Sequence, residues 1–302
     1  DSFAGRLRKL KLTLDDGRIV EPMAEAHWNS TDPENSNASM ILDGLGGNWL
    51  CLPFGMAESP KTLDERWLAN EPARSCSHGE TSNSQWVVAV KEGLVSLSFD
   101  FPLDHEIESV HREITQVSGG VSFKTSVKAR RKTDISMGHH PIFAMPESEG
   151  SLEISFPDGI DKVFTYPIQF EEGVSIFAHE KIYKNLNAVE TVTGKVVDAS
   201  RLPCLENAEE LVVVKPNTGR VRVTNHPGNF VSEVQWELDK LPGCLLWMSM
   251  NGRTESPWNA KFYGLGVEPI CGAFDLGLDV SRRHNPLNDH GMPTVLHLSP
   301  LN

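Results

Sequence analysis

Apolar and polar residues alternate with a period of two over much of the chain, as they do in strands with one buried face and one face in water. Residues 85–91, 95–101 and 121–128 follow this pattern, and residues 109–116 are rich in β-branched side chains that favour strands. The same reasoning predicts further strands at residues 163–170, 189–197, 211–214, 220–225, 230–238, 245–250 and 262–267. The pattern therefore predicts a chain built mainly of β-strands.

Segments rich in Gly and Pro separate these strands. Residues 118–120 (Ser-Gly-Gly) join two predicted strands and indicate a hairpin, and residues 157–159, 216–219 and 226–228 carry similar turn chemistry. Helical periodicity is scarce, and residues 61–69 are the best helix candidate. Many short strands joined by such turns favour an all-β antiparallel sandwich or barrel. Because no repeat or linker divides the chain, we expect one domain over residues 1–302.

The composition fits a folded chain with an acidic surface. A hydrophobic fraction of 39% suffices for a substantial core, and the formal net charge is -13. Such a surface repels phosphate backbones and anionic lipids, so we expect neither a nucleic-acid partner nor a membrane partner. No stretch approaches the roughly 18 apolar residues that span a bilayer.

The cysteines and the N-terminal segment suggest a reducing compartment. The five cysteines are odd in number and scattered, with no CxxC spacing, which favours free thiols over disulfides or a zinc ribbon. Residues 1–18 mix charges through their apolar positions and lack a signal-peptide core. We therefore predict a cytoplasmic location and give little weight to two matches to the N-glycosylation pattern, at Asn29 and Asn37.

Several familiar kinds of site are not indicated. The eleven histidines show no HxH or HExxH spacing, and no EF-hand pattern occurs, so we predict no metal site. Residues 44–47 are rich in Gly but lack the strand–loop–helix context and the Lys-Ser/Thr of a phosphate loop. No Gly-x-Ser-x-Gly elbow of a serine hydrolase occurs either.

Glu268 is the first residue with plausible acid–base chemistry. It follows an apolar strand and precedes Pro269, which restricts Glu268 to an extended conformation. A carboxylate behind Leu265 and Val267 is expected at the edge of a dry surface, where desolvation raises its pKa and makes it a usable general base. The alternative is a glutamate at a strand end that faces solvent.

His139 and His140 are adjacent, so on a strand their side chains point to opposite faces. This geometry argues against both binding one metal ion. One imidazole is expected to face a pocket, where it could act as a general acid near neutral pH, and the other to face the core or solvent. The alternative is one packed and one exposed histidine without a chemical role.

Residues 78–80 (His-Gly-Glu) follow an irregular stretch and precede the strand at Trp86. Loop residues on a rigid β scaffold are often binding groups. The alternative is a turn in which Gly79 supplies the flexibility and its neighbours cap the turn.

Taken together and in this order, three segments resemble motifs of the galactose mutarotase (aldose 1-epimerase) superfamily. The motifs are His78-Gly79 before a strand, His-Pro-Ile-Phe at residues 140–143, and an apolar strand ending in Glu268-Pro269. The resemblance covers roughly residues 40 to 300. It implies a large antiparallel β-supersandwich that binds sugar in a cleft on the concave face of one sheet.

The resemblance also implies a reaction. Glu268 would remove the proton from the anomeric hydroxyl while His140 protonates the ring oxygen, and the opened sugar would close to the other anomer. His78 would hydrogen-bond the sugar near the ring oxygen or C1. No cofactor is implied, because the two proton transfers balance within one site.

The sequence departs from the family in the residues that grip the sugar. Residues 49–55 contain no arginine where well-known aldose epimerases carry an Asn-Arg pair, and Glu80 lies where another arginine is usual. Glu80, Arg253 and Trp258 are therefore predicted as replacement binding groups. Trp258 would stack on the sugar or pack in a loop, and Arg253 would bond its hydroxyls or pair with a carboxylate, sulfonate or phosphate.

The sequence thus predicts an aldose 1-epimerase-like enzyme whose partner is a small-molecule carbohydrate. A non-catalytic carbohydrate-binding protein of the same fold is the first alternative, and an accessory domain of a lyase or hydrolase is the second. Retention of both His140 and Glu268 favours the enzyme, since binding alone does not require that pair. The sequence does not indicate the sugar or the oligomeric state.

Overall fold

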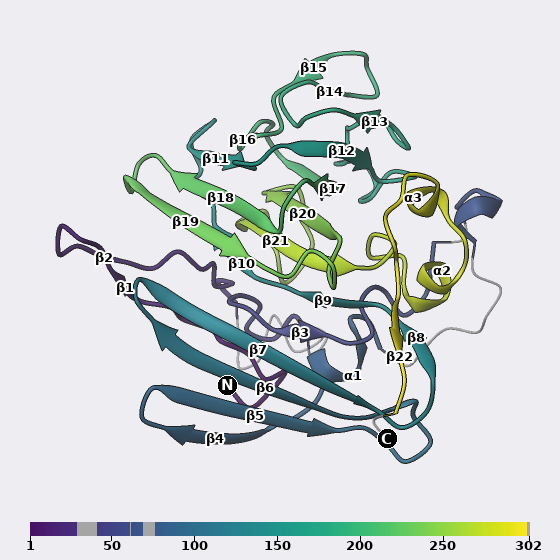
Figure 1. The fold of residues 1–302 in the computed structure, drawn as a ribbon. Helices are drawn as coiled ribbons and strands as arrows, with labels where there is room; N and C mark the ends of the chain where they lie inside the picture. Colours follow the sequence, from purple (N-terminus) through teal and green to yellow (C-terminus); the bar gives the residue numbers. More distant parts are fainter. Residues whose placement is uncertain (29–40, 61, 69–75, 301–302) are drawn as a thin grey trace.

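An eight-stranded antiparallel sheet lies at the centre of the computed structural model (Figure 1), which describes residues 1–28, 41–60, 62–68 and 76–300. Its strands, in pairing order, are β13 (Ile182–Tyr183), β12 (Ile160–Thr165), β17 (Ala208–Pro216), β20 (Gly243–Met250), β21 (Tyr263–Cys271), β9 (Met137–His139) and β3 (Leu50–Cys51), and β10 (Ile142–Ala144) also pairs with β21. Every residue of β20 is buried, because both faces of the sheet are covered. A strand covered on both faces is a continuous apolar run rather than an alternating one.

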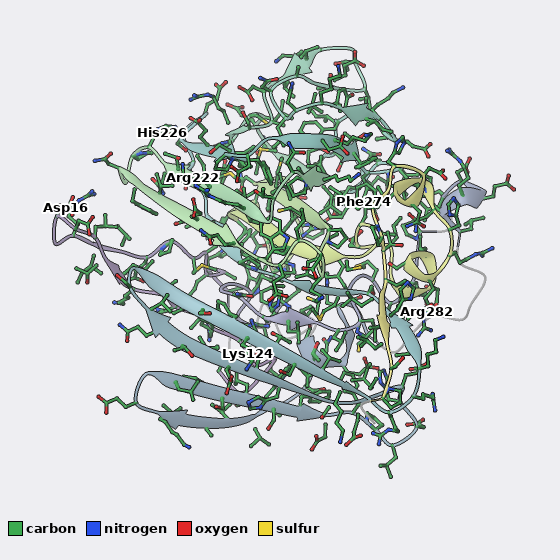
Figure 2. The ribbon with its side chains drawn as sticks, viewed as in Figure 1. Asp16, Lys124, Arg222, His226, Phe274 and Arg282 are labelled. Carbon is green, nitrogen blue, oxygen red and sulfur yellow. The ribbon has the colours of Figure 1, made fainter. Side chains whose placement is uncertain are left out.

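Two four-stranded antiparallel sheets pack against one face of this central sheet, the first over β17, β20 and β21 and the second over β3 and β9 (Figure 1). The strands of the first are β16 (Arg201–Leu202), β11 (Leu152–Ser155), β18 (Arg220–Asn225) and β19 (Phe230–Gln235). The strands of the second are β4 (Val87–Lys91), β5 (Leu94–Asp100), β6 (Ile107–Val117) and β7 (Gly120–Ala129). Charged side chains such as Lys124 on β7 and Arg222 on β18 extend from their exposed faces (Figure 2).

Short elements complete the chain. Three two-stranded ladders pair β1 (Leu12–Thr13) with β2 (Ile19–Val20), β14 (Val189–Glu190) with β15 (Val196–Val197), and β8 (Thr133–Ile135) with β22 (Leu296–Leu298). In the described part of the chain the helices are α1 (Gly79–Ser82), α2 (Leu278–Arg282), α3 (Pro286–Asp289) and the 3₁₀ turn η2 (Glu65–Trp67). No helix among the described residues is long and apolar enough to cross a membrane.

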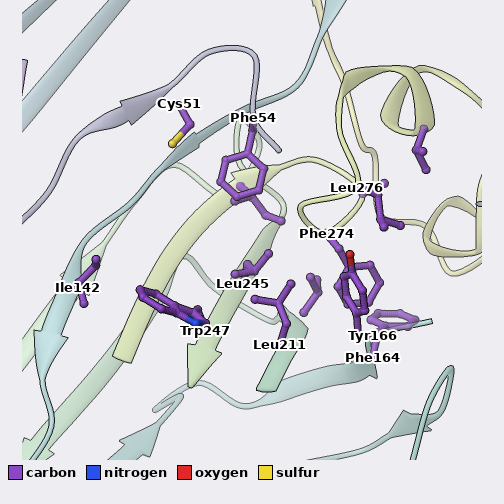
Figure 3. Packing of buried hydrophobic residues seen from close by; sticks show 14 of the residues in the cluster. Cys51, Phe54, Ile142, Phe164, Tyr166, Leu211, Leu245, Trp247, Phe274 and Leu276 are labelled. Carbon is purple, nitrogen blue, oxygen red and sulfur yellow. The ribbon is translucent and has the colours of Figure 1, made fainter. Parts of the chain in front are cut away.

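The central sheet contributes to three hydrophobic clusters, one on the first of its faces and two on the other. Leu211, Leu245 and Trp247 lie on the first face, in the same cluster as Phe274 (Figure 3). Trp49 belongs to this cluster as well. The neighbouring residues of the same strands point the other way and pack against β11 and β18. Burying each large apolar side chain contributes about 1.5–3 kcal/mol, so the two-sided burial holds the sheet rigid beneath any group placed on it.

The prediction of an all-β antiparallel fold is confirmed: every ladder between the named strands is antiparallel, and helix is confined to short pieces in the described ranges. The strand predicted at residues 220–225 matches β18. The turns at residues 118–120 and 226–228 close hairpins, as expected. The turns at residues 157–159 and 216–219 instead carry the chain between sheets, because β11 pairs with β18 while β12 pairs with β17.

Three local predictions were wrong. Residues 189–197 form the two short strands β14 and β15 instead of one strand, and β12 ends at Thr165, five residues before the predicted end at residue 170. The predicted helix at residues 61–69 is represented by η2 alone, which Asp64 caps; residues 61 and 69 lie outside the described part. Trp67 is buried in the structure, and an apolar residue at this position gave the sequence the pattern of a helix with one apolar face.

All five cysteines are free thiols, and three of them are buried. Of the residues that matched the N-glycosylation pattern, Asn29 and Asn37 lie outside the described residues.

Candidate active site

Glu268 lies within β21, not at its end as the sequence suggested. The strand runs on to Cys271 through Pro269, and Glu268 pairs in register with Leu245 of β20. Its side chain is 1% exposed. Gly266, two residues earlier and on the same face, leaves room for the carboxylate, since a Cβ at Gly266 would lie 2.5 Å from Glu268 Oε1.

His140 reaches the same place from the link between β9 and β10, the two strands that pair with β21. The backbone of β9 pairs Gly138 with Ile270, and that of β10 pairs Ile142 with Gly266, so the register places His140 opposite Glu268. Opposite residues of an antiparallel pair project from the same face. His140 Nε2 accordingly lies 3.4 Å from Glu268 Oε1.

Burial controls the electrostatics of this pair. It raises the pKa of the Glu268 carboxyl well above its usual 4.5, and nearby Asp275 adds to the rise. It lowers the pKa of the His140 imidazole well below its usual 6.5, with smaller contributions from His78 and Arg6. A raised carboxylate pKa makes a stronger base, and a lowered imidazolium pKa makes a stronger acid.

Aromatic stacking fixes the plane of the His140 ring. The indole of Trp49 stacks on it, with ring centroids 4.2 Å apart and planes 17° from parallel. The Arg6 guanidinium lies 4.9 Å from the centroid of the Trp49 ring and donates hydrogen bonds to the backbone carbonyls of Asp43 and Gly44. His140 is therefore oriented by packing from the central sheet and from the N-terminal segment.

His139 points to the opposite side, as adjacent residues of a strand must. Its Nδ1 lies 3.5 Å from Arg112 and its ring 6.5 Å from that of Phe123, both of the β4–β7 sheet. The sequence thus correctly separated the two rings, with His140 on the side of the cleft described below.

His78 adopts a left-handed conformation, with φ 58°, at the start of α1. Such a conformation costs about 1–3 kcal/mol for a residue other than glycine and persists where the surroundings impose it. Gly79 also has positive φ, and a Cβ there would lie 2.3 Å from the Leu52 carbonyl. The His78 ring meets that of His140 edge to face at 5.5 Å, and burial lowers its pKa to about 4, so it is neutral at physiological pH.

A cleft of about 620 Å³ contains these groups. Its lining includes His78, His140 and Glu268, the predicted binding residues Arg253 and Trp258, and the unpredicted residues Trp49, Tyr166, Phe170, Glu171, Trp247 and Asp275. A cleft of this size with apolar walls and a few polar groups is typical of small-molecule sites.

Arg253 and Trp258 stack on each other at one wall of the cleft. The guanidinium lies 4.6 Å from the Trp258 ring centroid, and its Nε donates a 2.9 Å hydrogen bond to Glu171 Oε2. Trp258 also packs edge-on against Trp28 at 4.7 Å. Arg253 therefore already has an anionic partner within the chain.

Glu80, predicted as a binding group, is not among the cleft-lining residues. Glu80 belongs to α1. Asn83, which caps the C-terminal end of α1, lines the cleft instead, and the side-chain amide of Asn83 donates hydrogen bonds to the carbonyls of Ser77 and Gly79. In a helical turn, adjacent or nearly adjacent side chains diverge, and the sequence could not show which one faces the cleft.

Within the ranges that the structure describes, no group of three or more His, Cys, Asp or Glu side chains is arranged to hold a metal ion.

Comparison with solved structures identifies the fold. A protein from Synechocystis sp. PCC 6803 superposes with a TM-score of 0.59 at 13% identity, over 98% of this chain and 92% of that one. A candidate aldose 1-epimerase from Escherichia coli gives 0.58 at 12% identity, over 97% and 95%. A galactose mutarotase-like protein from Lactobacillus casei gives 0.56 at 13% identity, over 99% and 90%.

The chain therefore has a galactose mutarotase-like fold, and the resemblance carried by the three motifs is confirmed at this level. No known family profile matches the chain, and no curated protein matches it in sequence.

Proposed function

We propose that this chain is an aldose 1-epimerase-like enzyme that interconverts the anomers of a sugar or sugar derivative by acid–base ring opening. The observation that carries the proposal is the Glu268–His140 pair, 3.4 Å apart and buried in a cleft large enough for a sugar. Anomer interconversion requires a base at the anomeric hydroxyl and an acid at the ring oxygen. Both oxygens are bonded to C1, so the two groups must lie close together.

The proposed reaction is balanced within the site. Glu268 takes the proton of the anomeric hydroxyl, the O–H electrons form the C1 carbonyl, and the bond from C1 to the ring oxygen breaks. The electrons of that bond go to the ring oxygen, which takes a proton from His140. Rotation about C1–C2 and the reverse transfers give the other anomer and restore both residues.

The pKa directions support this direction of transfer. Ring opening moves a proton from His140, whose pKa burial lowers, and adds one to Glu268, whose pKa burial raises. Each shift makes its half of the transfer more favourable than it would be in water. The same shifts hold the pair's single proton on Glu268 in the absence of sugar, so that proton must pass to His140 before the ring opens. His78, neutral and edge-on to His140, would hydrogen-bond the sugar near C1, while Arg253 and Trp258 would contact it at the far wall.

A non-catalytic carbohydrate-binding protein is the second candidate. The Arg253–Glu171 pair and the aromatic walls serve binding equally well, and binding alone does not require the buried acid–base pair.

One experiment separates the two candidates. We would follow anomer interconversion by polarimetry and NMR for aldoses, uronates and sugar phosphates, subtracting the spontaneous rate, and measure binding of each compound in parallel. The enzyme is supported if at least one sugar interconverts faster in proportion to protein concentration. Binding without acceleration for every sugar would establish the binding protein instead.

The pH dependence of the catalysed rate gives a prediction. Protonating both groups would leave a buried cation, so the loss of activity in acid should occur well below pH 6.5. Removing the last proton of the pair would leave a buried anion, so the loss of activity in alkali should occur well above pH 4.5. We therefore expect a flat rate between a loss in acid that lies below pH 6.5 and a loss in alkali that lies above pH 4.5, measured by polarimetry in buffers of constant ionic strength. A loss in acid centred at or above pH 6.5, or a loss in alkali centred at or below pH 4.5, would contradict these shifts.

A further inference from the structure

Asp275 is the cleft residue whose chemistry the proposed reaction does not use. It follows β21 in the segment that leads to α2, and it is 8% exposed. It lines the cleft, yet its Oδ1 accepts no hydrogen bond from any described residue. Buried carboxylate oxygens are normally satisfied, so an unsatisfied one in a binding cleft points to a donor supplied by a ligand.

The backbone holds this carboxylate firmly in place. Phe274 has φ 51°, a left-handed conformation that a bulky residue adopts only under constraint, and the Asp275 carbonyl accepts a 2.6 Å hydrogen bond from the Met56 amide. A Cβ at Gly55 would lie 2.9 Å from that carbonyl. The carbonyl of Gly55 in turn accepts a hydrogen bond from the His78 amide, so one segment positions both Asp275 and His78.

Tyr166 provides a partner on one side of the carboxylate only. Its hydroxyl donates to Asp275. Its ring lies beside that of Phe274 (Figure 3), with the ring centroids 5.3 Å apart. Burial raises the pKa of Asp275 to about 6, so the carboxylate is mostly ionised at neutral pH. The cleft thus contains a fixed negative charge with one oxygen still free to accept.

The other charges of the cleft offset it only in part, because Arg253 lowers the pKa of Asp275 while Glu171 raises it. Among the described lining residues, Arg253 is the only lysine or arginine, and Glu171 already pairs with it. The sequence left open whether Arg253 binds an anionic substituent of the sugar. An anionic substituent would have to displace Glu171 and approach Asp275, which is electrostatically unfavourable in a site of low dielectric.

We propose that Asp275 binds the substrate by accepting a hydrogen bond from a hydroxyl or ammonium group, and that the cleft thereby selects sugars without carboxylate or phosphate groups. This inference rests on the proposed function, because it concerns the same cleft and the same class of ligand. It assigns the substrate to neutral or amino sugars and Asp275 to their recognition.

The test compares one neutral aldose that the protein interconverts with its 2-amino, 6-carboxylate and 6-phosphate derivatives. Wild type, Asp275→Asn and Asp275→Ala would be compared, with Glu237→Gln, which removes an exposed carboxylate that does not line the cleft, as the matched control for general charge. Both kcat/KM for interconversion and Kd by NMR titration would be measured for each compound, after thermal melting has shown that each variant is folded.

For wild type we expect the neutral and amino sugars to exceed both anionic derivatives by about ten-fold or more in kcat/KM and in affinity. In Asp275→Ala, kcat/KM for the neutral sugar and the affinity for it should each fall by about ten-fold or more, because a hydrogen bond to a charged group is lost. Asp275→Asn, which keeps the shape but not the charge, should narrow the discrimination against anionic sugars. Glu237→Gln should leave this discrimination unchanged.

Two outcomes would overturn the inference and leave the proposed function intact: anionic sugars handled as well as neutral ones, or discrimination unchanged in Asp275→Asn. If no sugar is interconverted although sugars bind, the proposed function fails. The Kd series for the same variants then still decides the role of Asp275.

Discussion

Glu268→Gln is expected to abolish catalysed anomer interconversion while sugar binding persists. Glutamine fills the same volume beside Gly266 and keeps a polar contact with His140, but it cannot take the anomeric proton. Loss of a general base lowers the rate by roughly 10²–10⁴-fold. The rate would be measured by polarimetry above the spontaneous background, and Kd by NMR titration.

Glu210→Gln is the matched control for this variant. Glu210 is also buried and its pKa is raised to about 7, but its carboxylate accepts hydrogen bonds from the Ile176 and Phe177 amides, away from the cleft. We expect this control to retain activity. Full activity in Glu268→Gln, or an equal loss in both variants, would refute the assignment of Glu268 as the base.

His140→Gln is expected to cause a loss of similar size, about 10²–10⁴-fold, because a glutamine amide cannot deliver a proton to the ring oxygen. The loss should fall mainly on kcat, since His140 acts in the transition state and the Trp49 wall of the cleft remains. Steady-state kinetics on the best sugar of the panel would measure it.

His139→Gln offers the control within the same strand. His139 lies beside Arg112 on the other side of the sheet, so its replacement should leave kcat within a few-fold of wild type as long as the protein stays folded. A larger loss in His139→Gln than in His140→Gln would contradict the assignment of His140 as the acid.

The sequence predicted the strands best where one face is exposed. Residues 220–225 alternate because β18 has one buried face, and the prediction matches the structure. Strands β9, β10 and β3 were not predicted, because they are two or three residues long and carry no period. The composition of the turns at residues 157–159 and 216–219 could not show that the chain passes there from one sheet to another. Turns of the same composition occur both within hairpins and between strands of different sheets.

The acid–base pair could be predicted in part. Motif order indicated His140 and Glu268, and the strand rule separated His140 from His139. Their direct opposition depends on the pairing of β9 and β10 with β21, which no local pattern encodes. Asp275, Glu171 and Trp247 were missed for the same reason: each enters the cleft through tertiary contacts between segments far apart in the sequence.

The central claim is that one buried pair opens and closes a sugar ring. The most direct measurement is magnetisation exchange between the C1 signals of the two anomers of a ¹³C-labelled aldose, recorded with wild type and with the Glu268→Gln/His140→Gln double variant at equal concentration. We predict exchange cross-peaks above the spontaneous rate with wild type and none with the double variant. Equal exchange with both proteins, or none with wild type for every sugar that binds, would contradict the account.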